Sequence, residues 1–214
     1  MQARRTRRCY LLKAESWGLV GQNWALPASD TASLLSDSPQ QEQREPADAA
    51  QALDAVELKS AAQQDYSVLK EHLSKGAFQK ADDETRAKLI QLAGKEASKR
   101  NWVYFSEVQF IPSEDLQTID QLWKAGSGGV FGFSVQRELW MQNRKYWTRF
   151  FKAISWVTGE RNNYRKWPGE FMYTREAPKG HLPLTNCLRG TQLFEAILQH
   201  PAFVKESSNP DWMA

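Results

Sequence analysis

Basic and aromatic side chains alternate through the part of the chain between Arg137 and Arg175. Nine basic residues lie there against three acidic ones, Glu138, Glu160 and Glu170. Rings are densest in RNNYRKWPGEFMYTR (residues 161–175), whose Asn, Pro and Gly residues predict a loop rather than a core helix. Local positive charge attracts anions, and exposed rings cover flat apolar surface. The pattern predicts a cleft for an anionic partner with a flat apolar face.

The common sequence signatures of catalytic sites are missing. In GSGGVFG (residues 126–132), Phe131 stands where the third glycine of a dinucleotide-binding loop belongs, and the chain has no GK[ST] or GxSxG sequence. Cys187 and His181 form a pairing that chance supplies easily, and the three histidines are too scattered for a metal site. We therefore expect a binding protein rather than an enzyme, with no metal site of its own.

The overall charge helps to separate two classes of ligand. Single-stranded nucleic acid would stack on the rings and place its phosphates on Arg and Lys, and a planar macrocycle with acidic side arms would use the same residue types. A strand-binding groove usually needs a strongly basic domain, whereas the formal net charge is only +3. A compact dianion needs two or three well-placed arginines. The macrocycle is favoured, and a nucleic acid or a protein partner stays the alternative.

The glycine-rich stretch WKAGSGGVFGFSVQRELW (residues 123–140) presents two aromatic rings, Phe131 and Phe133, beside a sharp turn. One interpretation is that these rings grip the ligand. The other is that they fill the core next to the turn. This stretch alone does not separate the two interpretations.

The N-terminal part differs in composition from the rest of the chain. Residues 1–28 are rich in Arg and poor in acids, which is typical of an organelle transit peptide; a basic tail that is never removed is the alternative. Residues 29–64 contain few large apolar side chains, so we expect a disordered low-complexity linker, with a frayed helix near residues 53–58. No run of about 18 apolar residues occurs, so no membrane-spanning helix is expected.

Helical periodicity dominates from Asp65 to residue 203, and residues 204–214 form a polar tail. Asp65 can cap a helix that Gly76 ends, and a second helix follows from Phe78 to Gly94, which makes a helical hairpin. Further helices are expected from Ser113, from Ser134, from Tyr146 to Ile154, and from Leu188 to Leu198. The periodicity of residues 100–112 is mixed and leaves strand and irregular loop open.

Six short motifs make this chain resemble the genomes-uncoupled family of tetrapyrrole-binding proteins. They are, in chain order, FSEV (residues 105–108), LQTIDQLW (116–123), FGFSVQRELW (131–140), KWPGEF (166–171), APKGHLPL (177–184) and LRG (188–190). The likeness covers residues 65–203, and FGFSVQ together with GHLP is specific. It implies an all-α fold, a single compact helical domain with a cupped, loop-lined porphyrin cleft.

The resemblance also implies a function. Members bind protoporphyrin IX and Mg-protoporphyrin IX and stimulate magnesium chelatase in chlorophyll biosynthesis without being the catalyst. The expected partners are porphyrins and the large porphyrin-binding subunit of the chelatase, and no nucleic acid. The expected location is the chloroplast stroma, with peripheral association with plastid membranes allowed, and a role in plastid tetrapyrrole signalling is a further expectation.

The family motifs carry individual site residues onto this chain. Phe105 and Val108 match residues of the family's cleft, Trp167 matches the tryptophan of its mobile loop, and Arg189 matches the arginine of its LRG motif. Arg189 would pair with a propionate, and Asn186 would reach the metal side of the macrocycle. Some members carry a second basic residue where this chain has Gln192, so further propionate pairing would rest on other arginines. The porphyrin-binding residues we expect are Phe105, Val108, Phe131, Phe133, Arg137, Arg161, Arg165, Trp167, Asn186 and Arg189.

Overall fold

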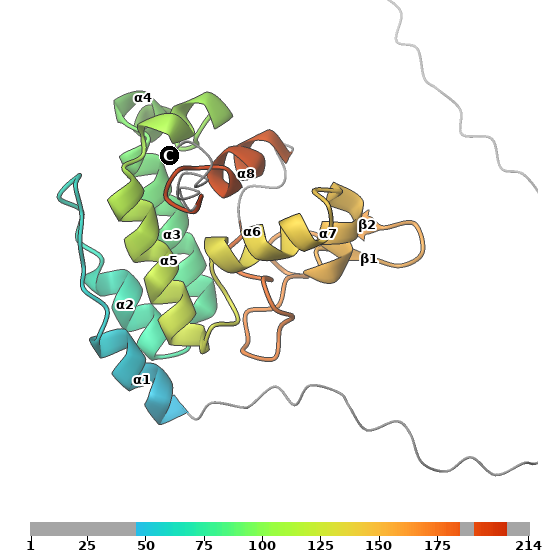
Figure 1. The fold of residues 1–214 in the computed structure, drawn as a ribbon, viewed down its shortest axis with the longest axis horizontal. Helices are drawn as coiled ribbons and strands as arrows, with labels where there is room; N and C mark the ends of the chain where they lie inside the picture. The colour runs from blue at the N-terminus through green and yellow to red at the C-terminus, as the bar shows by residue number, and fades with distance from the viewer. Residues whose placement is uncertain (1–45, 185–190, 205–214) are drawn as a thin grey trace, which may run out of the picture. The chain divides into compact units, whose positions relative to one another are not determined.

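The computed structural model describes residues 46–184 and 191–204, and these are mostly helical (Figure 1). The elements are α1 (Pro46–Asp54), α2 (Ser67–Ser74), α3 (Phe78–Leu92), α4 (Lys95–Arg100), the 3₁₀ helix η1 (Phe105–Phe110), α5 (Ser113–Ser127), α6 (Phe133–Gln142), α7 (Trp147–Ala153), β1 (Val157–Thr158), β2 (Asn163–Tyr164) and α8 (Thr191–Leu198). All of them fall within one compact unit. The predicted all-α class is confirmed, with one small antiparallel hairpin added.

The predicted helical hairpin corresponds to α2 and α3. Gly76 and Gly94, both with positive φ, follow the two helices as expected. Asp65 lies one residue further from α2 than a helix cap does, and its carboxylate accepts the backbone N–H of Ser67 at 2.8 Å. Helix α2 packs against both α3 and α5, which places α5 at the centre of this half of the fold.

Ordered structure begins before the boundary expected at residue 65. Helix α1 lies within the stretch 29–64, and Leu53 is buried against the rest of the core, with α1 packed on α5. Buried Asp115 of α5 ties down the following segment, because its carboxylate accepts the Tyr66 hydroxyl at 2.7 Å and the backbone N–H of Ala62 at 3.2 Å. Burial is the main cause that raises the pKa of Tyr66. Residues 1–45, with the expected transit peptide, and residues 205–214, with most of the expected tail, lie outside the described residues.

Two glycines of the stretch from Trp123 to Trp140 let elements approach closely. A Cβ at Gly126 would lie 2.9 Å from Cβ of Leu73, so α5 and α2 could not pack as they do. At Gly132, where φ is +136°, a Cβ would lie 2.8 Å from Oδ1 of Asp120. That carboxylate accepts the backbone N–H of Ser134 at 2.8 Å. The start of α6 is therefore capped by Asp120 of α5 rather than by the Ser134 side chain.

The ambiguous segment, residues 100–112, forms neither strand nor simple loop. Helix α4 ends at Arg100, a turn with left-handed Asn101 follows, and η1 occupies Phe105–Phe110. The predicted loop, residues 161–175, also contains structure, because β2 pairs with β1 with Val157 opposite Tyr164. In Figure 1 this hairpin lies beside α7, on the other side of the picture from α4.

Rings from α6, α7, α8, the residue before β1 and the loop after β2 form a buried aromatic cluster. Trp156 lies between Phe151 and Phe194, with ring centroids 5.6 and 5.1 Å away and nearly parallel planes. The members of this buried aromatic cluster are Trp140, Trp147, Phe150, Phe151, Trp156, Phe171 and Phe194. The cluster holds the C-terminal half together.

Candidate functional site

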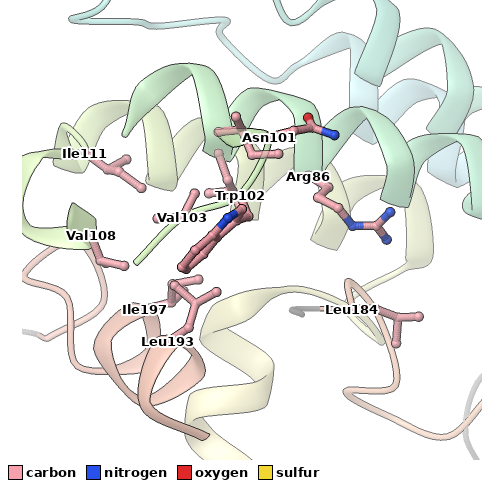
Figure 2. Close-up of a pocket in the computed structure, with 11 residues that line it drawn as sticks. Arg86, Asn101, Trp102, Val103, Val108, Ile111, Leu184, Leu193 and Ile197 are labelled. Carbon is pink, nitrogen blue, oxygen red and sulfur yellow. The ribbon is translucent and has the colours of Figure 1, made fainter. Parts of the chain in front are cut away.

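An apolar pocket lies between α3, the loop after α4, η1 and α8. Together with the open solvent at its mouth, it encloses about 480 Å³ that protein atoms do not fill. We call it the central pocket, and its lining residues are Arg86, Leu89, Ile90, Asn101, Trp102, Val103, Val108, Ile111, Leu184, Leu193 and Ile197. Figure 2 shows the indole of Trp102 extending toward Leu193 and Ile197 of α8, so this ring forms an aromatic wall.

Trp102 is held in place by a charged rim. The guanidinium of Arg100 lies 5.2 Å from the Trp102 ring and 4.5 Å from the Tyr104 ring, and the two rings are 4.0 Å apart. Glu107 accepts two hydrogen bonds of 2.7 Å from Arg100. The backbone N–H of Tyr104, and then Arg100, keep the pKa of Glu107 below its ordinary value. The rim therefore fixes the aromatic wall before any ligand arrives.

A second tryptophan contacts one residue of the wall of the central pocket. Trp167, in the loop after β2, is 43% exposed. Cζ of Arg86, a residue of the pocket wall on α3, lies 4.9 Å from the Trp167 ring. The loop of the KWPGEF motif thus contacts Arg86, a wall residue of the pocket that Val108 of the FSEV motif also lines.

A more open pocket adjoins the central pocket through Val108. We call it the η1–α8 pocket, and it holds about 550 Å³ between Phe105, Ser106, Val108 and Gln109 on one side and Ala196, Gln199, His200 and Pro201 on the other. Phe105 is 50% exposed there, while Val108 is buried. Two predicted residues therefore meet at the boundary between the pockets.

The predicted arginines do not converge on the central pocket. Arg165 is half-buried, and its guanidinium donates to the carbonyl oxygens of Ser155 at 2.7 Å and Glu170 at 3.0 Å. Arg161 is exposed in the hairpin between β1 and β2. Arg137 is half-buried on α6, and its Nε makes no hydrogen bond among the described residues. None of the three is a lining residue of either pocket described above.

Phe131 and Phe133 lie in the core. Both are fully buried, and Phe131 packs edge-on against Phe78 and Trp123 while Phe133 contacts Phe203. In this conformation both rings support the fold, and a direct contact with a ligand stays a prediction. Asn186 and Arg189 lie outside the described residues. Leu184 and Leu193, which precede and follow their segment in the chain, both line the central pocket.

The GHLP motif forms a structural junction rather than a lining of the central pocket. Buried His181 donates from Nδ1 to the carbonyl of Ile154 at 2.7 Å and accepts the backbone N–H of Met172 at Nε2, 3.1 Å away. Burial lowers the pKa of His181, so the ring is neutral and can accept this bond. The side-chain amide of Gln136 donates to the carbonyls of Gly180 and Pro183 at 2.9 Å each. The motif thus joins α6, α7 and the loop after β2.

Sequence reasoning missed most of the pocket wall, in particular Trp102 and Arg86. The aromatic density of residues 100–112 was a signal for Trp102, but it does not say which ring faces a cavity. Arg86 follows Asp82 by four residues, which is typical of an ordinary surface ion pair on a helix.

Among the described residues, no group of three or more His, Cys, Asp or Glu side chains is placed to hold a metal ion. No helix in residues 46–184 or 191–204 has the length and apolar character needed to cross a membrane.

Comparison with known proteins places this geometry in a family. The model of the GUN4-like family matches residues 59–201. A relative from Arabidopsis thaliana, named tetrapyrrole-binding protein, chloroplastic, is 48% identical over 151 residues, which are 67% of this chain and 57% of the relative. The chain thus spans less than two thirds of that relative's length.

Two solved structures share the fold. The structure of GUN4 from Chlamydomonas reinhardtii has 58% sequence identity and a TM-score of 0.68, and the match covers 72% of this chain and 99% of that one. The ligand-free structure of Arabidopsis thaliana GUN4 has 49% identity and a TM-score of 0.61, covering 66% and 99%. The chain belongs to the GUN4-like family.

Proposed function

We propose that this protein binds protoporphyrin IX and Mg-protoporphyrin IX at the central pocket and acts as a regulator rather than a catalyst. The name of the Arabidopsis relative, tetrapyrrole-binding protein, supports the ligand class. The observation that carries the proposal is that a residue of one family motif lines an apolar cavity and a residue of a second motif contacts Arg86 in its wall. Val108 lies in its wall, and Trp167 lies against Arg86 at its edge.

The lining of the pocket fits an apolar, flat ligand. Most of its lining residues are aliphatic, and the indole of Trp102 adds a planar surface (Figure 2). Removing apolar surface from water stabilises a complex by about 25 cal/mol per Å², before the cost of association is subtracted. Phe105 and Val108 would extend this apolar contact into the η1–α8 pocket. Phe131 and Phe133 would act as buried support for the same wall.

The acidic arms of the ligand need cations that are not already paired. Arg86 and Arg100 both carry carboxylate partners, and Arg165 is bonded to backbone carbonyls, so these three are poor candidates. We keep Arg189 as the residue that pairs with a propionate and Asn186 as the one that faces the metal. Arg137, with its Nε unbonded among the described residues, and exposed Arg161 are the additional candidates.

The regulatory part of the proposal concerns magnesium chelatase. We propose that the porphyrin-loaded protein stimulates this enzyme through its large porphyrin-binding subunit, in the stroma of the chloroplast or at the surface of plastid membranes. The name of the chloroplastic relative supports the location. A chelatase assay with and without this protein tests the stimulation.

Porphyrin titration tests the binding. Deuteroporphyrin is added to the purified chain while Trp fluorescence and the porphyrin absorption band are recorded. Saturable quenching is expected, and Trp167→Ala should weaken it. The matched control is Tyr146→Ala, which removes an exposed ring at the start of α7 that lines neither pocket. Unsaturable quenching, or equal affinity of wild type and Trp167→Ala, would contradict the proposed site.

One observation favours the alternative function. Exposed Tyr146 lies beneath the guanidinium of Arg149 at 5.1 Å, a pairing of ring and cation that could also stack a nucleotide base. A gel-shift assay with a single-stranded oligonucleotide separates the two functions. Saturable porphyrin binding without an oligonucleotide shift supports the porphyrin proposal, and the reverse result supports the alternative.

A further inference from the structure

Asp82 of α3 is a buried carboxylate that joins two distant parts of the chain. Its side chain is 2% exposed, and its Oδ1 accepts the backbone N–H of Leu184, a residue of the pocket wall, at 2.6 Å. Its Oδ2 accepts a hydrogen bond of 2.8 Å from Nη2 of Arg86 one helical turn along α3. A buried carboxylate without such partners would be costly. Asp82 therefore holds the guanidinium of Arg86 and the backbone at Leu184 in fixed positions.

The N–H groups of Arg86 donate to carboxylates, so its planar face is available to contact an aromatic ring. Its Nη1 donates to Asp83 at 3.1 Å, in addition to the bond from Nη2 to Asp82. Figure 2 shows the guanidinium end pointing away from Trp102. Because both Nη atoms of Arg86 already donate to aspartate side chains, this guanidinium is a poor partner for a ligand anion. Its face instead lies against the Trp167 ring, 4.9 Å from the centroid, where a cation and an indole attract each other.

The turn that carries Trp167 is fixed at its base but not at its tip. The backbone N–H of Lys166 donates to the Glu170 carboxylate at 2.8 Å, and Arg165 donates to the Glu170 carbonyl at 3.0 Å. These bonds close the loop below the indole. The ring itself is 43% exposed, and the contact with Arg86 orients it relative to the pocket wall.

We propose that Arg86, fixed by Asp82, is a positioning residue that holds Trp167 at the edge of the central pocket and thereby sets porphyrin affinity without touching the macrocycle's acidic arms. This inference rests on the proposed function. It predicts that Arg86 acts through Trp167, so the two side chains are coupled in ligand binding.

The test is a double-mutant cycle with deuteroporphyrin as the probe. Dissociation constants are measured for the wild type, Arg86→Met, Trp167→Leu and the double variant. Arg86→Met alone should weaken binding roughly three- to tenfold, the size expected for one partly exposed cation–π contact. In the Trp167→Leu background the same change should have almost no effect. Independent, multiplying effects of the two substitutions would overturn the proposal.

Two further variants guard against misinterpretation. Arg86→Lys keeps a cation for Asp82 but lacks the planar face, so it should fold even if Arg86→Met does not, and it should weaken binding by at least twofold. Wild-type affinity of a folded Arg86→Lys would also overturn the proposal. Arg149→Met is the matched control, because Arg149 lies over the exposed Tyr146 ring in the same way but away from the pockets. It should leave affinity unchanged.

A ligand-free measurement separates this inference from the proposed function. The fluorescence of Trp167, and its quenching by acrylamide, is obtained by subtracting the signal of the matching Trp167→Leu protein from that of the protein with Trp167. Arg86→Met should increase the quenching of Trp167, since the guanidinium no longer covers one face of the ring. If the wild type binds no porphyrin, the proposed function fails, but this measurement still tests whether Arg86 covers the Trp167 ring. If porphyrin binds but neither quenching nor coupling changes, the inference alone fails.

Discussion

The protein has two aromatic regions that differ in how their rings are held. In the buried aromatic cluster, rings pack on one another and all but half-buried Trp147 are almost completely covered, as Trp156 is between Phe151 and Phe194. Around the two pockets, the rings are partly exposed, and arginines hold them: Arg100 lies over Trp102 and Arg86 over Trp167. Both arginines are fixed by carboxylates.

This difference explains how the described part of the chain can use its tryptophans for two purposes. A ring that is surrounded by other rings gains its free energy from packing and is unavailable to a ligand. A ring that rests on a paired guanidinium is oriented by that cation and remains partly exposed. The comparison predicts that substitutions in the first region change stability and that substitutions in the second change ligand affinity.

The largest effect is expected for Trp156→Ala. The substitution removes two stacked contacts and the hydrogen bond of 2.9 Å from the indole to the carbonyl of His181. We expect the free energy of unfolding to fall by about 3 to 5 kcal/mol, as for other buried aromatic residues. Urea denaturation followed by circular dichroism measures this loss. A loss below about 1 kcal/mol would show that the cluster does not stabilise the fold as its packing implies.

The pH dependence of stability should distinguish two buried titratable groups, Asp82 beside the central pocket and His181 beside the buried aromatic cluster. Burial raises the pKa of Asp82, beside the central pocket, to about 7 from 3.8, against the opposing effects of Arg86 and Leu184. Between these values the folded state binds more protons than the unfolded state, so this contribution to stability is lost as pH rises from about 4 to 7. For His181, beside the buried aromatic cluster, burial lowers the pKa from its ordinary value of 6.5. Its contribution is lost as pH falls below about 6.5.

Asp82→Asn tests the first of these contributions. We measure the free energy of unfolding of wild type and variant at pH 5, 6, 7 and 8. The difference, wild type minus variant, should decrease by roughly 1 to 4 kcal/mol as pH rises through this range, because one pKa unit corresponds to 1.36 kcal/mol. Any constant cost of the substitution cancels in the comparison across pH. A pH-independent difference would mean that Asp82 has an ordinary pKa.

The predictions from sequence succeeded where neighbouring residues decide the structure. The apolar spacing of α3 and α5 and the glycines after α2 and α3 were sufficient to place these helices, because periodicity and caps are local properties. Helix α1 was not expected as an ordered element, since Leu53 is its single large apolar residue. It is stabilised by Leu53, which reaches a core built mainly from later residues. The capping of α6 by Asp120 was missed for the same reason, because the carboxylate comes from another helix.

The candidate site was predictable only in part. Val108, Phe105 and Trp167 came from motif resemblance, and the structure places them at or beside the two pockets. Counting charges suggested arginines as anion partners, but sequence does not show which cations are already paired. Arg165 is bonded to backbone and Arg86 to two carboxylates, and only the folded chain reveals this. Trp102 faces the cavity because of the turn after α4, which no local pattern predicted.

A smaller effect on stability, but a clear one on ligand binding, is expected for Trp102→Ala. The indole forms the aromatic wall of the central pocket and extends toward Leu193 and Ile197 (Figure 2). Losing its flat surface should weaken deuteroporphyrin binding about tenfold or more, given about 25 cal/mol for each Å² of apolar contact. Fluorescence titration gives the affinity, and a thermal melt shows that the fold persists. An unchanged affinity would place the ligand outside the central pocket.

The smallest effect is expected from removing positive charge on α7. Arg149 and Lys152 are exposed there, Arg144 is exposed in the turn before it, and none of the three forms an ion pair with another described residue. Replacing all three with Gln should change the free energy of unfolding by less than about 0.5 kcal/mol per site, as is usual for surface positions. Porphyrin affinity should change less than about twofold, because screening weakens the effect of exposed charges that lie beyond a Debye length from a ligand. Oligonucleotide binding, if the chain has any, would fall steeply, since phosphate contacts depend on such cations. A large loss of porphyrin affinity would instead indicate that the ligand lies closer to α7 than to Trp102. It would contradict the distinction between the two aromatic regions.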